Sequence, residues 1–173
     1  MQHEIDKPVP IDGLAALAVD LQPVFLDEVS HPEDFRRNCR FFFRAVNLFE
    51  IPLFLTEQVP EKLGRTEQNL LELSQEAFVF PKDKFSAFGA SGLSSALKNA
   101  GVCHLLLAGV ETSICVYLTA LEALSQGKAV TVLTDCVSCR RSSDGKWALR
   151  KLAMGGCHLL SVESVFYGML SGA

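Results

Sequence analysis

The sequence predicts an α/β fold of three layers (α/β/α), in which helices cover both faces of a six-stranded, mainly parallel sheet of the Rossmann-like kind. Three observations predict it. Short apolar runs alternate with amphipathic segments along the chain. These runs lack the polar–apolar alternation of a sheet with one exposed face, which indicates strands buried on both faces. The length of 173 residues suits one domain, so we take 1–173 as a single domain.

The predicted strands are short apolar runs that end at a polar residue or a glycine. The first run, LAALAV, stops at Asp20, and the most apolar run stops at Gly109. Their lengths are ordinary for strands of globular proteins. In chain order, the predicted strands are residues 14–19, 52–55, 77–80, 102–108, 129–133 and 157–162.

The predicted helices lie between these strands and carry apolar residues at helical spacing. Pro32 favours the start of the first one, and Gly101 and Gly127 end two later ones. The stretch 57–68 is polar, contains a proline and a glycine, and is predicted to be a loop. In chain order, the predicted helices are residues 31–50, 69–73, 91–99, 113–126, 144–154 and 164–170.

Composition and charge exclude several classes of partner. Hydrophobic residues make up 49% of the chain and charged residues 21%, which is enough apolar material for a core. The net charge is −4 and no basic stripe appears, so we expect no nucleic-acid and no membrane partner. The N-terminus lacks the pattern of a secretory signal, and the longest apolar runs are too short to span a bilayer. Six cysteines without an export signal indicate reduced thiols, so we expect a cytoplasmic protein.

Residues with reactive side chains follow the predicted strands. The carboxyl ends of parallel strands meet at one edge of the sheet, where ligands bind in such folds. A carboxylate, an ammonium and a thiol are therefore expected along one rim, although they lie far apart in the sequence. The residues at these strand ends are Asp20, Thr56, Lys82, the stretch 111–115 and Asp135.

Cys115 is the most informative of these residues. It lies in the first turn of the helix after the fourth strand, where unpaired backbone N–H groups and the helix dipole favour a thiolate. The same N–H groups are suited to hold an oxyanion. Asp20 is a candidate base for the thiol, and Lys82 a candidate partner that keeps the carboxylate ionised. The alternative is an inert buried cysteine beside ordinary residues that begin loops.

Four segments resemble the isochorismatase-like cysteine hydrolases, in order and in strand-end placement. The third resembles the nucleophile turn G-[VI]-x-T-x-x-C-V, and the second the pattern K-x-x-[FY]-S-[AG]-F, which aligns its lysine with Lys82. A further stretch, TEQVP at 56–60, is similar to the subgroup named for isochorismatase domains. The four segments are VDLQ at 19–22, KDKFSAF at 82–88, GVETSICV at 109–116 and LTD at 133–135.

The resemblance implies a hydrolase that acts on a small molecule. It implies Asp20 as base, Lys82 as its partner and Cys115 as nucleophile. It also implies a cis peptide bond between Val110 and Glu111, which would aim the amides of Glu111 and Cys115 at an oxyanion. Four further side chains are candidates to line the substrate pocket, namely Gln22, Gln58, Phe85 and Arg140.

The chain departs from the family pattern at the place of the metal motif. Nicotinamidases of the superfamily carry Asp-x-His after the second strand, where this chain has Thr56-Glu57-Gln58. We therefore expect no metal and no cofactor, and we do not expect nicotinamidase activity. Isochorismatases that cleave a vinyl ether lack the nucleophilic cysteine, so the presence of Cys115 argues against that reaction.

The resemblance also implies a homo-oligomer, a dimer or a tetramer. Phe41, Phe42 and Phe43 are consecutive on one helix, so at most two of their rings can face the sheet. The third is expected in a subunit interface or under a neighbouring arginine. The predicted helix 113–126 is apolar over much of its circumference, which favours association. A deeply buried helix in a monomer is the alternative.

Two other functions remain as alternatives. One is a non-catalytic binding protein that keeps the fold, because the presence of the residues does not prove turnover. The other is a thiol redox protein that uses Cys136 and Cys139, which form a C-x-x-C pattern. We rank the redox function lowest, because such a pair normally lies on a helix near the first βαβ unit.

Overall fold

The fold is a parallel six-stranded sheet between two layers of helices, as the sequence predicts. The computed structural model describes residues 12–74 and 76–171. The strand order is β3-β2-β1-β4-β5-β6, and every neighbouring pair is parallel. The strands are β1 (Leu14–Val19), β2 (Leu53–Gln58), β3 (Ala77–Lys82), β4 (His104–Val110), β5 (Ala129–Ser138) and β6 (His158–Leu160).

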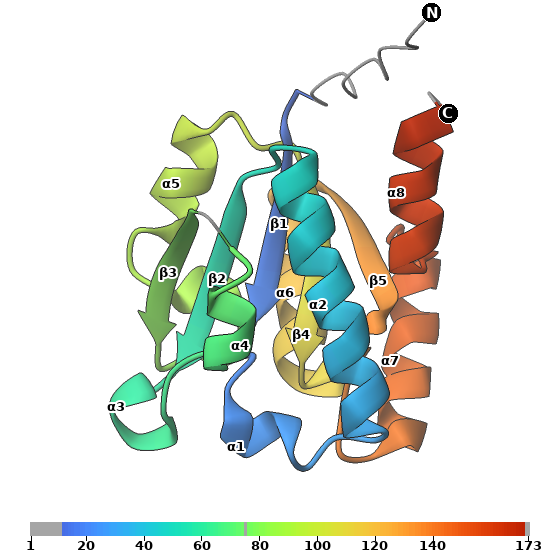
Figure 1. The fold of residues 1–173 in the computed structure, drawn as a ribbon. Helices are drawn as coiled ribbons and strands as arrows, with labels where there is room; N and C mark the ends of the chain where they lie inside the picture. Colours follow the sequence, from blue (N-terminus) through green and yellow to red (C-terminus); the bar gives the residue numbers. More distant parts are fainter. Residues whose placement is uncertain (1–11, 75, 172–173) are drawn as a thin grey trace, which may run out of the picture.

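Helices cover both faces of this sheet (Figure 1). One face packs against α2 (Pro32–Leu48) and α8 (Val162–Ser171), and the other against α5 (Leu93–Asn99), α6 (Tyr117–Ser125) and α7 (Ser142–Met154). Alternate residues of β1 enter the two cores, because successive side chains of a strand point to opposite faces: Ala16 and Ala18 enter one core, Ala15 and Leu17 the other.

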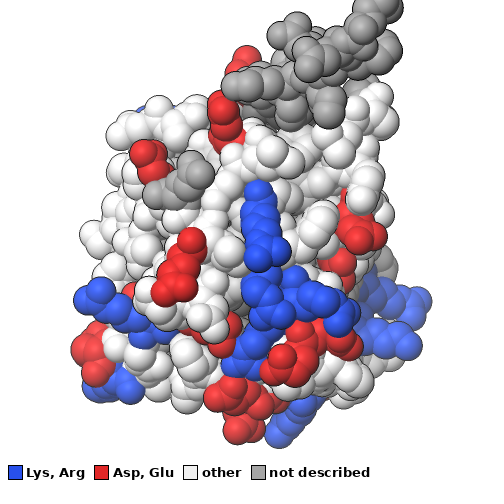
Figure 2. Space-filling model, viewed as in Figure 1, with Lys and Arg blue, Asp and Glu red and all other residues white. Residues whose placement is uncertain are grey.

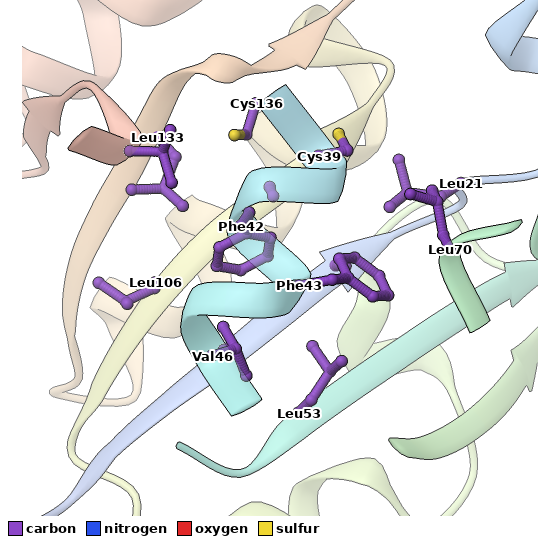
Figure 3. Packing of buried hydrophobic residues seen from close by; sticks show 14 of the residues in the cluster. Leu21, Cys39, Phe42, Phe43, Val46, Leu53, Leu70, Leu106, Leu133 and Cys136 are labelled. Carbon is purple, nitrogen blue, oxygen red and sulfur yellow. The ribbon is translucent and has the colours of Figure 1, made fainter. Parts of the chain in front are cut away.

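The core beneath α2 is rich in aromatic and aliphatic side chains. Phe42 and Phe43 are fully buried side by side (Figure 3) and meet edge to face, with ring centroids 5.9 Å apart. Phe41 is 37% exposed. Two of the three consecutive rings therefore face the sheet and one does not. On α6, Leu118 and Leu121 are also exposed, at 39% and 37%. Helices α2 and α6 thus each present apolar side chains to solvent.

Several elements differ from the sequence-based expectation. The polar stretch after β2 contains α3 (Pro60–Leu63), and α1 (Pro23–Leu26) follows β1. Each has four residues and begins with proline, so neither is long enough to show helical periodicity. The predicted helix over 69–73 is α4 (Gln68–Leu71). Strand β5 runs five residues beyond the expected end at 133, past a register shift opposite β4 between Leu107 and Gly109.

The predicted helix over 113–126 begins as a different kind of turn. Residues Thr112–Val116 form a π-helical turn, η2, and the regular helix α6 starts only at Tyr117. Cys115 therefore lies in the π-helical turn. Such turns often occur at functional sites.

The carboxyl ends of the strands point to the end of the molecule where α1 and α3 lie, at the bottom of Figure 1. Figure 2 shows that the charged residues of this view gather toward the same end, with Lys and Arg next to Asp and Glu. No helix among residues 12–74 and 76–171 is both long and apolar enough to cross a membrane.

Candidate active site

The sheet brings the ends of four adjacent strands together. Val19 is opposite Thr56 on β2 and opposite Gly109 on β4, and Gln58 is opposite Lys82 on β3. Gly109 has a φ of 126°, and a Cβ there would overlap the backbone of Val19. Only glycine allows β4 to approach β1 this closely next to Asp20.

Asp20 and Lys82 form a buried ion pair at this edge. The Lys82 Nζ lies 2.7 Å from Asp20 Oδ2, and the two side chains are 0% and 1% exposed. Thr56 donates to the other carboxylate oxygen at 3.0 Å. The Lys82 ammonium also donates to Gln58 Oε1 at 2.6 Å and to the carbonyls of Lys84 and Phe85 at 3.0 and 3.3 Å. Four oxygens thus surround the ammonium, which fixes it as the counter-ion of Asp20.

Burial has the largest effect on the pKa of the Asp20 carboxyl. It raises the pKa of the carboxyl above its ordinary value, and the charge and hydrogen bond of Lys82 oppose this rise. Hydrogen bonds from Thr56 and Cys115 also favour the ionised form. A carboxylate with a raised pKa is a better proton acceptor than an exposed one.

The Cys115 thiol lies against this carboxylate. Cys115 is 8% exposed, and the Asp20 carboxylate and the Glu111 backbone both act on the pKa of its thiol through hydrogen bonds. Burial and the charge of Asp20 raise the pKa of Cys115 to about 11, although Lys82 and the Glu111 amide act in the opposite direction. The expectation of a thiolate at the start of this helix is therefore wrong for the resting site. The thiol is protonated because it is buried next to a negative charge.

The peptide bond between Val110 and Glu111 is cis. Val110 is buried at the end of β4, and the Glu111 carbonyl accepts hydrogen bonds from the amides of Ile114 and Val116, both at 3.1 Å. The Glu111 carboxylate accepts from Arg140 Nε at 2.8 Å. Glu111 thus connects the end of β4, the turn that carries Cys115 and the segment after β5.

The candidate pocket residues occupy different positions. Gln22 is fully buried, donates to the carbonyls of Gln58 and Gly64, and accepts from the Gln58 amide at 2.7 Å. Gln22 therefore lies behind the site and fixes the segment that carries Gln58. Phe85 is 60% exposed. The Arg140 side chain is similarly exposed, at 61%, but forms an ion pair. Gln58 contacts Lys82, and Arg140 is held by Glu111.

Other predicted residues lie away from this site. Asp135 accepts a hydrogen bond from the amide of Val162 at the start of α8. Cys136 is fully buried, and hydrogen bonding with Cys39 of α2 is the largest cause of its raised pKa. Cys139 donates to the carbonyl of Arg141 at 3.1 Å. The two thiols of the C-x-x-C pattern thus have different partners, which argues against a redox pair. Glu57, at the position of the metal motif, accepts two hydrogen bonds from Thr66.

Two supporting contacts are not evident from the sequence. Thr56 is expected only at the rim, but it donates to Asp20, and Gln58 is expected in the pocket, but it accepts from Lys82. The strand order predicts both contacts, because β2 lies between β1 and β3 and its last residues are next to both strands.

Comparison with known proteins identifies the family. The model of the Isochorismatase domain matches residues 15–164. Isochorismatase domain-containing protein 2 of Danio rerio is 31% identical over 163 residues, which cover 93% of this chain and 81% of that protein. Isochorismatase domain-containing protein 1 of the same fish is 30% identical over 152 residues, or 88% of this chain. The match spans only 53% of that protein's length, and 51% of its relative in Salmo salar.

Solved structures have the same fold. YcaC from Pseudomonas aeruginosa, described with hexane-2,5-diol and covalent acrylamide, has a TM-score of 0.88 and 26% identity over 97% of this chain and 85% of that one. A protein from Caenorhabditis elegans described as MAR1 ribonuclease has a TM-score of 0.86 and 27% identity, over 95% and 84%. YcaC from Escherichia coli, described as an octameric hydrolase of unknown specificity, has a TM-score of 0.83 and 24% identity, over 92% and 78%. With its sheet order, its strand-end site and these matches, the chain belongs to the isochorismatase family.

Proposed function

We propose that this chain is a cysteine hydrolase that cleaves an amide or a related acyl bond of a small molecule. The observation that carries the proposal is the place of the Cys115 thiol beside Asp20, a carboxylate held by the enclosed ammonium of Lys82. A nucleophile, a base within hydrogen-bond reach and a third group that orients the base form the usual constellation of covalent catalysis.

In the first half of the reaction, Cys115 attacks the acyl carbon while its proton passes to Asp20. Because the resting thiol is protonated, proton transfer accompanies the attack. The resulting oxyanion accepts hydrogen bonds from the amides of Glu111 and Cys115. Asp20 then returns the proton to the leaving amine, the C–N bond breaks, and a thioester of Cys115 remains.

In the second half, water attacks the thioester. Asp20 takes one proton from the water, the carboxylic acid leaves, and the proton returns to the Cys115 sulfur. Lys82 takes no part in these proton transfers, and its ammonium donates to four oxygens. Its role is to hold Asp20 in place and to offset its charge.

The test uses an activated ester, p-nitrophenyl acetate, together with a panel of simple primary amides. The wild-type protein is expected to form an acetyl adduct on Cys115, seen by intact mass and peptide mapping, and to release p-nitrophenolate in a burst. Cys115→Ser retains an oxygen at the site but is expected to lose the burst. An adduct distributed equally over the six cysteines would overturn the proposal.

A non-catalytic binding protein is the second candidate. It shares the fold and predicts that Cys115 is no more reactive toward the ester than the exposed thiol of Cys103. The same adduct map therefore separates the two candidates, with Cys103 as an internal reference in each sample.

The assembly and the location of the protein belong to the proposal as well. We propose a homo-oligomer, a dimer or a tetramer, supported by the exposed Phe41, Leu118 and Leu121 and by the octamer described for the relative in Escherichia coli. Sedimentation equilibrium that gave one species near 18.9 kDa would reject this oligomer.

We propose a cytoplasmic location on the basis of the six free thiols, although one relative in Phytophthora sojae is described as a secreted effector. Fractionation of cells that express the chain tests the location.

A further inference from the structure

We propose that Arg140 is a positioning residue, which holds the backbone amide of Glu111 in place at the Cys115 sulfur by clamping the Glu111 carboxylate. The inference rests on the proposed function, because that amide is one of the two oxyanion donors. It concerns a side chain that does not touch the thiol itself.

Glu111 is fixed at three points. Its backbone acts on the Cys115 thiol through a hydrogen bond that lowers the pKa of this thiol. Its carbonyl accepts the amides of Ile114 and Val116 and so begins the π-helical turn. Its carboxylate accepts from Arg140 twice, from Nε at 2.8 Å and from the backbone amide at 3.3 Å. The first two contacts belong to the reactive turn, and the third ties this turn to the segment after β5.

The third contact is needed because the carboxylate is buried. The Glu111 side chain is 11% exposed, whereas that of Arg140 is 61% exposed. Removing the partner of a buried charge leaves an uncompensated group, which must turn toward water or take up a proton. The Glu111 carboxylate turns about its own side-chain bonds, and when it leaves the Arg140 guanidinium the reactive turn loses the charged contact that ties it to the segment after β5. Loss of Arg140 is therefore transmitted to the donor at the sulfur.

Arg140 is suited to this role by its geometry. The guanidinium donates from Nε to one carboxylate oxygen of Glu111 at 2.8 Å, and the backbone amide of Arg140 donates to the other at 3.3 Å. Replacing the side chain therefore removes the shorter, charged contact and leaves the backbone contact in place. The neighbouring Arg141 is 84% exposed and its nearest acidic partner is Asp144, at 4.0 Å. It provides a matched control with the same change of charge.

The experiment compares Arg140→Gln, Arg141→Gln and the double variant Arg140→Gln/Glu111→Gln. Each is treated with p-nitrophenyl acetate, whose attack creates an oxyanion, and separately with iodoacetamide, whose displacement does not. Adducts on Cys115 are mapped and normalised to those on Cys103. Because the readout is the reaction of Cys115 itself, it does not depend on whether the acyl-enzyme is later hydrolysed.

We expect Arg140→Gln to slow acetylation of Cys115 roughly tenfold, part of the ~10²–10³-fold loss that deletion of an oxyanion donor causes. Iodoacetamide alkylation is expected to change much less, and Arg141→Gln is expected to behave as wild type. The double variant replaces the ion pair by two neutral amides and is expected to recover most of the acetylation rate. A merely structural role would slow both reagents together and would not produce this recovery.

Three results would overturn the inference. The first is acetylation of Cys115 in Arg140→Gln at the wild-type rate. The second is an equal loss with both reagents, together with a lowered melting temperature. The third is a selective loss that the double variant fails to restore, which would indicate that Arg140 contacts the reagent directly. If acetylation never favours Cys115 over Cys103 in the wild type, the proposed function fails instead.

Discussion

Two buried thiols near the carboxyl end of the sheet make an instructive comparison. Cys115 follows β4 and Cys136 lies on β5, and they are 8% and 0% exposed. The pKa of both is raised. For Cys115 the causes are burial first and then Asp20, whereas for Cys136 they are the hydrogen bond with Cys39 first and then burial. The two residues differ mainly in their neighbours.

This difference indicates what makes a buried cysteine reactive. Cys136 and Cys39 lie in the core beneath α2, among leucine and phenylalanine side chains (Figure 3). Among the groups that act on Cys136, Cys39 is itself a thiol, and the Asp135 carboxylate accepts a hydrogen bond from the Val162 amide. Cys115 has a carboxylate to accept its proton and an amide to stabilise negative charge nearby. Burial and a carboxylate raise both pKa values, but only at Cys115 does the carboxylate also act through a hydrogen bond with the thiol.

The largest expected effect is the loss of the nucleophile. Cys115→Ala is expected to abolish the p-nitrophenolate burst and the acetyl adduct at this position, whereas Cys136→Ala is expected to leave both unchanged. The measurement is stopped-flow absorbance with parallel intact-mass analysis. A burst that persists in Cys115→Ala, or one that disappears in Cys136→Ala, would reverse the comparison.

The second effect is the removal of the base. Asp20→Asn is expected to slow acetylation at neutral pH by about 10²–10⁴-fold, the usual range for general base catalysis. The same change removes the charge and the hydrogen bond that raise the pKa of Cys115, so this pKa is expected to fall from about 11 toward its ordinary value. Iodoacetamide alkylation near pH 9 should then become faster while acetylation at pH 7 becomes slower. Parallel changes of the two rates would refute the assignment of Asp20.

The third effect concerns the counter-ion. Lys82→Met leaves the Asp20 carboxylate buried without its partner, and breaking such a pair typically costs ~3–5 kcal/mol of unfolding free energy. Lys84→Met is the matched control, because the Lys84 side chain is 72% exposed and its nearest acidic partner is 3.9 Å away. Urea denaturation of both variants measures the difference. Equal stability of the two would show that the enclosed ammonium does not stabilise the site.

The strand-end rule predicted where the reactive residues meet, but not how they interact. Asp20, Lys82 and Cys115 could be placed together because each follows a strand of one parallel sheet. Their contacts depend on distances and burial that no sequence pattern encodes. For this reason the thiolate expectation for Cys115 was wrong. A helix start favours the ionised thiol, but burial beside Asp20 outweighs it.

The remaining differences have similar physical causes. The four-residue helices α1 and α3 are too short for a periodic signal, and the five-residue π-helical turn continues directly into α6. The role of Gln22 depends on two backbone carbonyls that approach it from a segment at least 36 residues away. Such long-range contacts become visible only when the strand order is known.

A smaller effect, on the free energy of unfolding, is expected at high pH. A folded thiol with a raised pKa keeps its proton when the unfolded thiol has lost it, so its contribution to stability is complete below pH 9 and is lost as the pH rises toward 11. The expected loss for Cys115 is ~2 kcal/mol over this window. Because other buried thiols also contribute, the informative quantity is the difference between wild type and Cys115→Ala. If the two stability curves stay parallel from pH 8 to 11, the pKa of Cys115 is not raised.

The smallest effect tests the inert member of the comparison. Cys136→Ala removes one sulfur from the core beneath α2 and leaves Cys39 without its partner, so we expect a loss of about 1 kcal/mol in unfolding free energy, in the range typical of single substitutions. The matched variant is Cys39→Ala, which removes the other member of the pair. If the two thiols only pack and share one hydrogen bond, each variant should lose a similar amount, and the double variant should lose less than the sum because the pair is already broken. Neither variant should change the acetylation rate of Cys115.

Strict additivity of the losses in urea denaturation would show that the two thiols do not interact. A changed acetylation rate of Cys115 would show that the two sites are coupled through β5.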